Sequence, residues 1–278
     1  MPGTEGLIWR RALERSAQAR RDGSLIPLVT RLIELDGLAP FQLRQLCSAT
    51  PKHLLEPGPR ANPFLPWEAS LEVQRLGHSH VLLLNKYPVQ TGHVLLITQE
   101  WAPQDGWLAA ADWAAVVEVA ADTSGLWFFN SCTEAGASQP HRHLQLLPRL
   151  ADEPACPLEP AIRAQLEQGA LPWPWPYRLS RRGPREDHHA LAAHYHDHAR
   201  ALGLGDPELG GRPRHPYNLL FSDDWFLMIR RRRERMAGFS VNALGFAGYL
   251  LLTSQADLGW LERHGPWALL AEVAAEIQ

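Results

Sequence analysis

The sequence predicts an α+β fold with a sheet at its centre, on the basis of three patterns. Apolar runs on either side of NKYPVQTG predict a β-hairpin at 80–98. A helical pattern at 109–121 is followed by strand, small-residue loop and strand over 126–148. A second hairpin pattern occupies 217–230, with strands YNLLFS and WFLMIR. Hairpins and helices in this order are typical of α+β proteins.

The segment before the first hairpin predicts helices and one loop. Residues 4–21 form an amphipathic helix, with apolar residues on one side and arginines on the other. Residues 28–35 and 40–47 are also predicted to be helical. The stretch 51–68, PKHLLEPGPRANPFLPWE, contains too many prolines for a regular element and is predicted to be an extended loop.

The remaining elements flank the second hairpin. Residues 149–185 are irregular and proline-rich, which indicates a linker or a loop covering the sheet. A helix is predicted at 187–203. After the hairpin, further helices are expected near 242–252, 257–264 and 266–277.

Composition excludes several classes of protein. A net charge of −3 and a pI near 6.5 give no basic field for nucleic acid. No apolar run reaches the ~18 residues that span a bilayer, and the N-terminus lacks the apolar core of a signal peptide. Three widely spaced cysteines suit a reducing compartment. We therefore expect a cytoplasmic protein that binds neither nucleic acid nor membrane.

Two residue types are scarce and therefore worth locating. Only Lys52 and Lys86 are lysines, although the chain has 27 basic residues. The asparagines are Asn62, Asn85, Asn130, Asn218 and Asn242. Arginine replaces lysine on a solvated surface but does not reproduce a compact ammonium group everywhere.

The segment GASQPHRHLQLLP at 136–148 carries the strongest chemical signal. Alternate side chains of a strand share a face, so His141, His143 and Gln145 are predicted to project together. Such a polar set does not build a core, because each buried polar group needs a partner. The small residues before it allow backbone N–H groups to approach a phosphate. A histidine beside such a loop is placed to attack phosphorus and form a covalent intermediate.

The His-x-His pattern alone leaves other interpretations open. It also occurs by chance, as half of a metal site, or in metal-binding β-barrels. A metal-binding β-barrel normally supplies a nearby Glu and a later His on an all-β scaffold. Here Gln145 follows, and much helix is predicted.

Taken with its neighbours, the segment resembles the diadenosine tetraphosphate phosphorylases (ATP adenylyltransferases), a branch of the histidine-triad (HIT-like) superfamily. FFNS precedes the motif and LLP follows the glutamine. Four further segments resemble the family in the family's order: NPFLPWE, NKYPVQTGHVLLIT, YNLLFS and SVNALGFAGYLLL. The resemblance covers residues from about 50 to 255.

The resemblance implies a role for each matching position. His143 would be the nucleophile that takes AMP from the α-phosphate, and His141 would orient it or help to bind phosphate. Gln145 stands where related hydrolases have a third histidine, and a neutral amide favours transfer over hydrolysis. The implied nucleotide-binding residues, besides Gln145, are Lys52, Asn85, Lys86, Asn130, Gly136, Ala137, Ser138, Gln139, Asn242, Ala243, Leu244, Tyr249 and Thr253. Ala137 replaces a common Ser, and Thr253 stands where some members have a basic residue.

The resemblance also implies an architecture and ligands. We expect a HIT-like, mainly antiparallel sheet flanked by helices, with a C-terminal ATP-adenylyltransferase segment. Residues 1–185 would form the catalytic region and residues 186–278 a region completing the nucleotide site. The expected ligands are a dinucleoside polyphosphate, ATP, ADP and phosphate, with a divalent cation such as Mg²⁺ on the polyphosphate. No protein-bound metal site, no organic cofactor and a monomer are expected.

Four other features have a structural interpretation beside a functional one. The histidine cluster at 187–198 places His194 and His198 at a spacing that binds zinc, yet a solvated helix or loop is favoured. The run RRRRER at 230–235 favours a solvated strand end over a phosphate patch. Most tryptophans are expected to be packing residues rather than adenine platforms. His93 is interpreted as a core or edge histidine.

Competing functions also follow from the sequence. A histidine-triad hydrolase is disfavoured by Gln145, and a sugar-1-phosphate uridylyltransferase by NALGFAG. Intact His143 argues against a catalytically silent nucleotide sensor. Helix content opposes a metal-binding β-barrel oxygenase.

Overall fold

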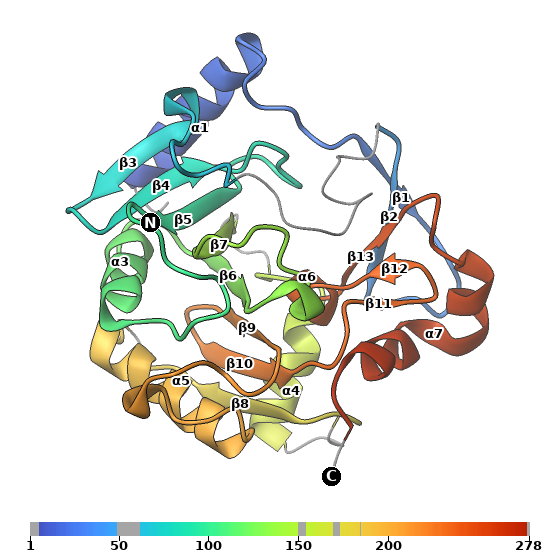
Figure 1. The fold of residues 1–278 in the computed structure, drawn as a ribbon. Coiled ribbons are helices and arrows are strands. Elements are labelled where there is room, and N and C mark those ends of the chain that lie inside the picture. The colour runs from blue at the N-terminus through green and yellow to red at the C-terminus, as the bar shows by residue number, and fades with distance from the viewer. Residues whose placement is uncertain (1–5, 49–61, 150–153, 169–172, 184, 277–278) are drawn as a thin grey trace.

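One eight-stranded sheet forms the centre of the molecule (Figure 1). The computed structural model describes residues 6–48, 62–149, 154–168, 173–183 and 185–276. Neighbouring strands follow the order β3-β4-β5-β7-β6-β9-β10-β8, and every neighbouring pair is antiparallel. The strands are β3 (Glu72–Leu76), β4 (His80–Leu84), β5 (Val94–Thr98), β6 (Gly125–Asn130), β7 (His143–Pro148), β8 (Tyr177–Arg181), β9 (Tyr217–Phe221) and β10 (Trp225–Arg230).

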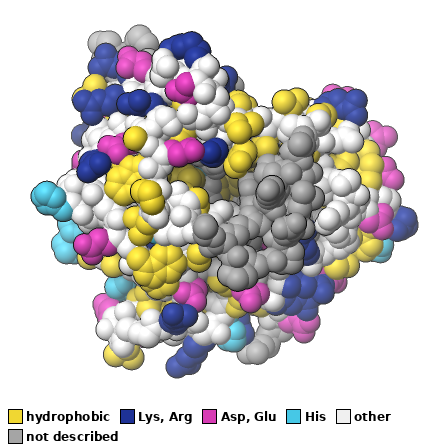
Figure 2. All heavy atoms as spheres, turned by 45° about the horizontal axis from the view of Figure 1, so that its top comes forward, with side chains coloured by type: hydrophobic (Ala, Val, Ile, Leu, Met, Phe, Trp, Pro, Cys, Tyr) yellow, Lys and Arg dark blue, Asp and Glu magenta, His cyan; other side chains and the backbone are white. Residues whose placement is uncertain are grey.

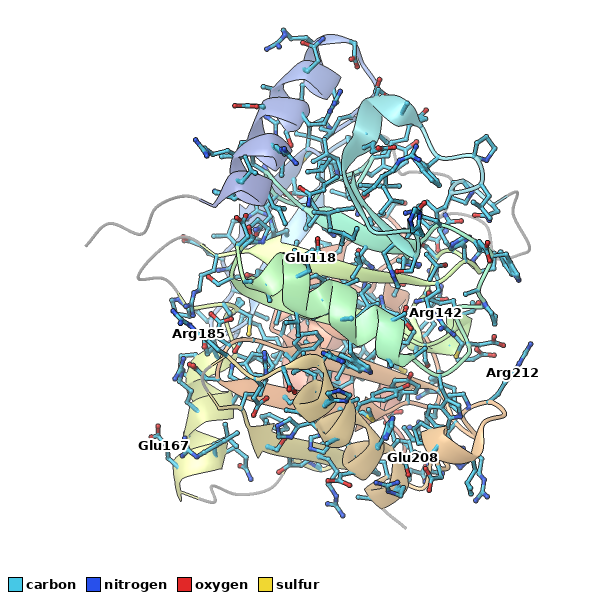
Figure 3. The ribbon with its side chains drawn as sticks, turned by 90° about the vertical axis from the view of Figure 1, so that its left-hand side faces the viewer. Glu118, Arg142, Glu167, Arg185, Glu208 and Arg212 are labelled. Carbon is cyan, nitrogen blue, oxygen red and sulfur yellow. The ribbon has the colours of Figure 1, made fainter. Side chains whose placement is uncertain are left out.

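Three helices cover one face of this sheet (Figure 3): α1 (Leu7–Arg21), α3 (Ala110–Ala120) and α5 (His188–Ala201). Alternate apolar side chains of the strands meet them there. Trp113 of α3 and Tyr195 of α5 are fully buried and share one core cluster with Leu144 of β7 and Phe226 of β10. This layer buries the inner sides of α3 and α5.

The opposite face packs against C-terminal elements and a small sheet. The helices are α4 (Glu159–Gln168), α6 (Ala243–Phe246) and α7 (Leu258–Val273), which is kinked at Gly265. The small sheet has the order β1-β2-β13, with β2 and β13 parallel. Its strands are β1 (Thr30–Ile33), β2 (Gln42–Leu46) and β13 (Tyr249–Leu252). A separate two-stranded hairpin consists of β11 (Arg235–Met236) and β12 (Phe239–Ser240). Short 3₁₀ turns are η1 (Ala69–Leu71), η2 (Thr133–Ala135) and η3 (Pro207–Leu209).

The surface shows how these layers divide the molecule. On the face shown in Figure 2, a hollow separates the lobe that carries α1 and β3 from the lobe that carries the small sheet. Basic and acidic side chains are interspersed on this face. None of the described helices combines the length and apolar character that a membrane crossing requires.

The structure confirms the predicted α+β class and both hairpins, but four assignments were wrong. Residues 28–35 and 40–47 contain strands β1 and β2, not helices. The stretch 149–185 contains α4 and the edge strand β8, so it is part of the sheet rather than a linker. The last turn of the helix predicted at 242–252 is strand β13. In the segments predicted to be helical, a short sequence pattern fits both periodicities, and pairing with another strand decides between them.

Candidate active site

The His-x-His motif opens strand β7 and has the predicted alternation of faces. The rings of His141 and His143 both lie against Phe64, at centroid distances of 5.7 and 5.6 Å. Arg142, between them, points to the helical side and forms an ion pair with Asp112 of α3 (Figure 3). Both histidines are buried. The strand therefore presents two imidazoles on one face and anchors itself through the other.

His143 is held in one tautomer. Its Nδ1 lies 2.8 Å from the carbonyl oxygen of His141, and because a carbonyl only accepts, Nδ1 carries the proton. Burial lowers the pKa of His143 to about 4, since the protonated ring loses hydration. At neutral pH the ring is uncharged, and its Nε2 carries a lone pair. This is the state that a histidine nucleophile requires.

His141 has both ring nitrogens engaged. The Asn62 amide donates to its Nδ1 (2.9 Å), and its Nε2–H donates to the carbonyl oxygen of Thr98 (2.8 Å). The Trp101 ring lies edge-on to the imidazole at 5.4 Å. Burial lowers the pKa of His141 as well. The ring is thus locked, and what it offers His143 is the position of its backbone carbonyl.

Gln145 is oriented by His93. Nε2–H of His93 donates to Gln145 Oε1 (3.0 Å), and the Asn85 amide nitrogen lies 3.3 Å from His93 Nδ1. Burial lowers the pKa of His93 to about 4, so this ring is also neutral. His93, interpreted from the sequence as a core or edge histidine, is buried but connects two of the predicted nucleotide-binding residues. With its Oε1 bound, Gln145 is left to present its amide N–H groups.

The loop between β6 and β7 turns at Gly136. This residue follows η2 and has φ +89°, in the left-handed region that glycine adopts without strain. A Cβ atom at Gly136 would lie 2.6 Å from Cβ of Asn242. Only a glycine therefore lets the loop contact the C-terminal segment this closely.

The loop amides are only partly available to a phosphate. The N–H groups of Gly136 and Ala137 donate to carbonyl groups earlier in the same loop. Those of Ser138 and Gln139 make no hydrogen bond with another described residue. The sequence-based expectation of a run of phosphate-binding amides thus narrows to the last two positions.

Asn130, at the end of β6, links the strands around the histidine motif to the C-terminal segment. Its Oδ1 accepts from the Asn218 amide (2.8 Å) and from the backbone N–H of Ala243 (2.9 Å). Both asparagines are buried and face each other across the β6–β9 pair. The Asn130 side chain therefore sets the position of α6.

Arg231 also connects the β6–β7 loop to the C-terminal segment. It is 1% exposed and donates to the carbonyl oxygens of Ala135 and Val241 and to Oδ1 of Asn218. Burial lowers the pKa of Arg231 to about 9. The expectation of a solvated strand end is wrong for this residue, whereas residues 232–233 do form surface ion pairs.

The predicted C-terminal residues lie in two places. Asn242 caps α6 by accepting from the N–H of Leu244 (2.9 Å), directly beside the loop. Tyr249 lies on β13 opposite Gln42, and Thr253 accepts from a backbone N–H in the turn that follows. Tyr249 belongs to the small sheet, and Thr253 follows the end of its strand β13.

The structure describes one of the two lysines, Lys86. Lys86 forms an ion pair with Glu68, Nζ to Oε1 2.7 Å, at a partly exposed position one residue beyond Asn85. Lys52 lies outside the described residues.

Within the histidine cluster at 187–198, His194 and His198 contact neighbouring protein side chains. His194 contacts Ser180 Oγ (3.0 Å) and Glu186 Oε1 (3.2 Å), and His198 is buried against Phe226. In the described part of the chain no group of three or more His, Cys, Asp or Glu side chains is arranged to hold a metal ion.

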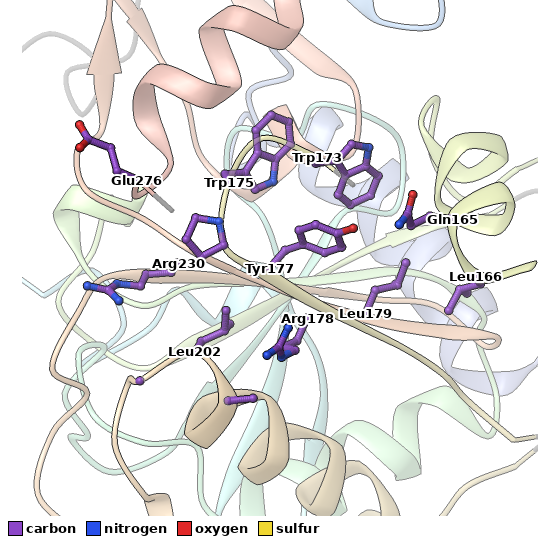
Figure 4. A pocket seen from close by; sticks show the side chains of 13 residues that line it. Gln165, Leu166, Trp173, Trp175, Tyr177, Arg178, Leu179, Leu202, Arg230 and Glu276 are labelled. Atoms are coloured by element: carbon purple, nitrogen blue, oxygen red, sulfur yellow. The ribbon is translucent and has the colours of Figure 1, made fainter. Parts of the chain in front are cut away.

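A cavity of about 760 Å³ lies at the β8 edge, apart from the motif (Figure 4). None of the predicted site residues lines it. Its wall includes Trp173, Trp175, Tyr177, Arg178, Arg230 and Glu276.

The sequence motifs did not identify four residues that hold the site together. Gln104 bonds the backbone of His143, Phe64 packs on both motif histidines, and Asn218 and Arg231 fix the loop junction. Asparagine scarcity was a signal for Asn218. A single buried arginine within an arginine run and a lone glutamine in a loop carry none.

Comparison with known families separates two parts of the chain. Residues 2–164 match the Ap4A phosphorylase N-terminal domain. The chain belongs to the Ap4A phosphorylase family. Residues 170–276 match the ATP adenylyltransferase C-terminal domain. The resemblance inferred from the motifs is confirmed.

Two yeast proteins show the distance of the relationship. Protein APA1 of Saccharomyces cerevisiae is 27% identical over 202 residues, 62% of this chain. Diadenosine 5',5'''-P1,P4-tetraphosphate phosphorylase 2 of the same yeast is 35% identical over 77 residues, 24% of this chain. These matches span 61% and 24% of the two relatives' lengths.

The fold is that of yeast Ap4A phosphorylase Apa2. Its crystal structure superposes with a TM-score of 0.77 over 98% of both chains, at 20% identity. Its complex with Ap4A gives 0.76 over 98% of both, at 19% identity. The expected mainly antiparallel sheet flanked by helices is confirmed. The boundary expected at residue 185 stays a prediction.

Proposed function

We propose that the chain catalyses the reversible phosphorolytic cleavage of diadenosine 5',5'''-P1,P4-tetraphosphate (Ap4A) to ADP and ATP. The observation that carries this proposal is the His143 imidazole. It is neutral, its Nδ1–H is bound to the His141 carbonyl, and its Nε2 therefore carries the lone pair. Family membership supplies the reaction class.

The first step is adenylyl transfer to the protein. Nε2 of His143 attacks the α-phosphorus of one adenosine, the P–N bond forms, and the bond to the bridging oxygen breaks so that ATP leaves. The imidazole becomes positively charged as the bond forms. The hydrogen bond from Nδ1–H to the His141 carbonyl then strengthens, because a charged donor bonds more strongly. No proton has to be added to the leaving polyphosphate.

The second step uses inorganic phosphate. A phosphate oxygen attacks the adenylyl phosphorus, the P–N bond breaks, and ADP forms while His143 returns to its neutral state. The Gln145 amide would hold a phosphoryl oxygen during both steps without acting as a base for water. The reverse sequence builds Ap4A from ATP and ADP.

Charge on the polyphosphate needs compensation. Lys52, Lys86 and the N–H groups of Ser138 and Gln139 would supply part of it. A divalent cation such as Mg²⁺ would be carried by the phosphates themselves. We further propose that the protein acts as a monomer in the cytoplasm. The three cysteines, all free, are compatible with that compartment.

The test is a product analysis of Ap4A incubated with and without phosphate. ATP plus ADP formed only with phosphate supports the proposal. AMP plus ATP without phosphate would identify a hydrolase, and binding without turnover would identify a sensor. His143→Ala should abolish transfer of α-phosphate label to the protein, whereas replacement of the exposed His78 by Ala should not.

A further inference from the structure

The ladder between β6 and β7 stops just before the nucleophile. Paired residues run from Gly125–Pro148 to Phe128–Gln145, and in that register the next hydrogen-bonded pair would be Asn130 and His143. This pair is absent from the described ladder. The backbone groups of both residues are buried and need partners.

The side chain of Gln104 supplies partners to three of these four backbone groups. Its Oε1 accepts from the N–H of His143 (2.8 Å), and its Nε2 donates to the carbonyl oxygens of Asn130 (2.6 Å) and His143 (3.3 Å). Gln104 is 3% exposed, and its own N–H donates to the carbonyl of Pro140. One amide thus bonds both carbonyl groups and the His143 N–H of the missing strand pair and lies between the two strands at this point.

The surrounding segment contacts the motif residue by residue. Thr98 binds the His141 ring, the Ala102 carbonyl accepts from the N–H of Arg142, and Gln104 binds the backbone of His143. The chain from Thr98 to Gln104 therefore runs alongside the motif and is hydrogen-bonded to each of its three residues. Only Gln104 within it bonds the predicted nucleophile directly.

We infer that Gln104 is a positioning residue that sets the direction of His143 Nε2 by holding the His143 backbone away from β6. This rests on the proposed function, because it presumes that His143 is the nucleophile. Without the amide, β6 and β7 either pair directly or admit water, and both move the His143 backbone. The same loss would loosen Asn130, whose side chain holds α6.

Gln104→Met tests this directly, because it keeps the length of the side chain and removes all three hydrogen bonds. The measured quantity is the single-turnover rate of adenylyl-protein formation from α-labelled Ap4A at saturating substrate. We expect a loss on the order of 100-fold in this rate, the scale of a displaced reacting group. Substrate affinity should change less than about threefold, since a positioning group acts mainly on the chemical step.

Gln104→Glu provides a signature that a purely structural role would not give. A protonated carboxyl both accepts and donates, so it replaces the amide, whereas the ionised form faces two carbonyl oxygens without a proton. The single-turnover rate of this variant should fall as pH rises from 5 to 8, on the order of tenfold or more. Other titratable groups near His143 are His141 and His93, and these are unchanged.

Gln99→Glu is the matched control. Gln99 also donates through its amide to two backbone carbonyls, of Gly77 and His80, but it does not contact His143. It should keep the wild-type pH profile. A folded Gln104→Met protein with the wild-type single-turnover rate, or a Gln104→Glu profile like that of wild type, would overturn the inference. Failure of wild type to form an adenylyl-protein would instead overturn the proposed function.

Discussion

Acidification tests the state of the predicted nucleophile. Burial lowers the pKa of His143 to about 4, against 6.5 for an ordinary histidine. At pH 5.5 a group with a pKa of 4 is about 97% neutral, whereas one with a pKa of 6.5 is about 9% neutral. The structure therefore predicts that adenylyl transfer at pH 5.5 keeps nearly its full rate. An exposed histidine nucleophile would have lost about tenfold.

The assay is a single-turnover transfer of α-label from Ap4A to excess protein between pH 8 and 5. Ap4A suits it because its phosphates are all internal and lack the ionisation near pH 6 that a terminal phosphate has. The folded fraction is followed in parallel by tryptophan fluorescence, so that unfolding is not counted as lost chemistry. Each rate is divided by that fraction.

The control separates the nucleophile from other buried histidines. Burial also lowers the pKa of His198 to about 4, yet this residue is on α5 and has no part in the site. His198→Gln should leave the normalised profile unchanged. Half-loss of the wild-type rate near pH 6.5 would refute the argument that burial keeps His143 neutral.

Three further predictions follow. The pKa values of His93 and His143 in the folded protein lie below the unfolded value, so their contribution to stability is complete above about pH 6.5 and is lost toward pH 4. Each histidine should therefore lower the free energy of unfolding, measured in urea, by about 2 kcal/mol at pH 5 relative to neutral pH. A free energy of unfolding that stays constant over this range would contradict the argument. Gly136→Ala should weaken Ap4A binding and lower the melting temperature, whereas Gly23→Ala, at φ +78° in open space, adds backbone strain alone and should leave binding intact; equal binding by both variants would argue against the close approach at the loop. Lys86→Arg keeps the surface charge but should reduce turnover, because a forked guanidinium does not reproduce a compact ammonium; wild-type kinetics would leave Lys86 with its surface ion pair only.

The sequence predicted the strands of the two hairpins. The first hairpin has a longer loop and the second a short turn, but the strands of both are almost wholly buried apolar runs, so periodicity and turn residues suffice. β8 and β13 escaped prediction because their partners are distant in sequence, whereas β1 and β2 pair with each other locally but are short and half-exposed. β13 pairs with β2 across about two hundred residues, and no local pattern records that contact.

The sequence identified the residues of the candidate site that have reactive or ligand-binding side chains, but not the residues that hold those side chains in position. The motif histidines stand out because polar side chains alternate on one strand face. Gln104 and Arg231 do not, because their partners are mainly backbone carbonyls and N–H groups, which every residue has. Such residues are recognised only when the hydrogen-bond partner of each buried backbone N–H and C=O group is identified in the structure.

Scarcity was a better guide for asparagine than for lysine. All five asparagines bond within the site or its frame: Asn62 to His141, Asn85 to His93, Asn130 to Asn218, and Asn242 at the cap beside the loop. A short amide both donates and accepts at fixed geometry, and arginine does not replace it. Lys86 instead lies in a surface ion pair.

The pairing of β6 with β9 has a consequence for how the protein can be divided. The parts that match the two family domains meet in one hydrogen-bonded sheet, through pairs from Trp127–Phe221 to Asn130–Asn218. A fragment ending near residue 168 would turn β6 into an open edge beside β7, the strand of the histidine motif, with buried aromatic side chains uncovered. The two parts should therefore lose structure in one cooperative transition, and separately produced fragments should regain adenylyl transfer only when mixed.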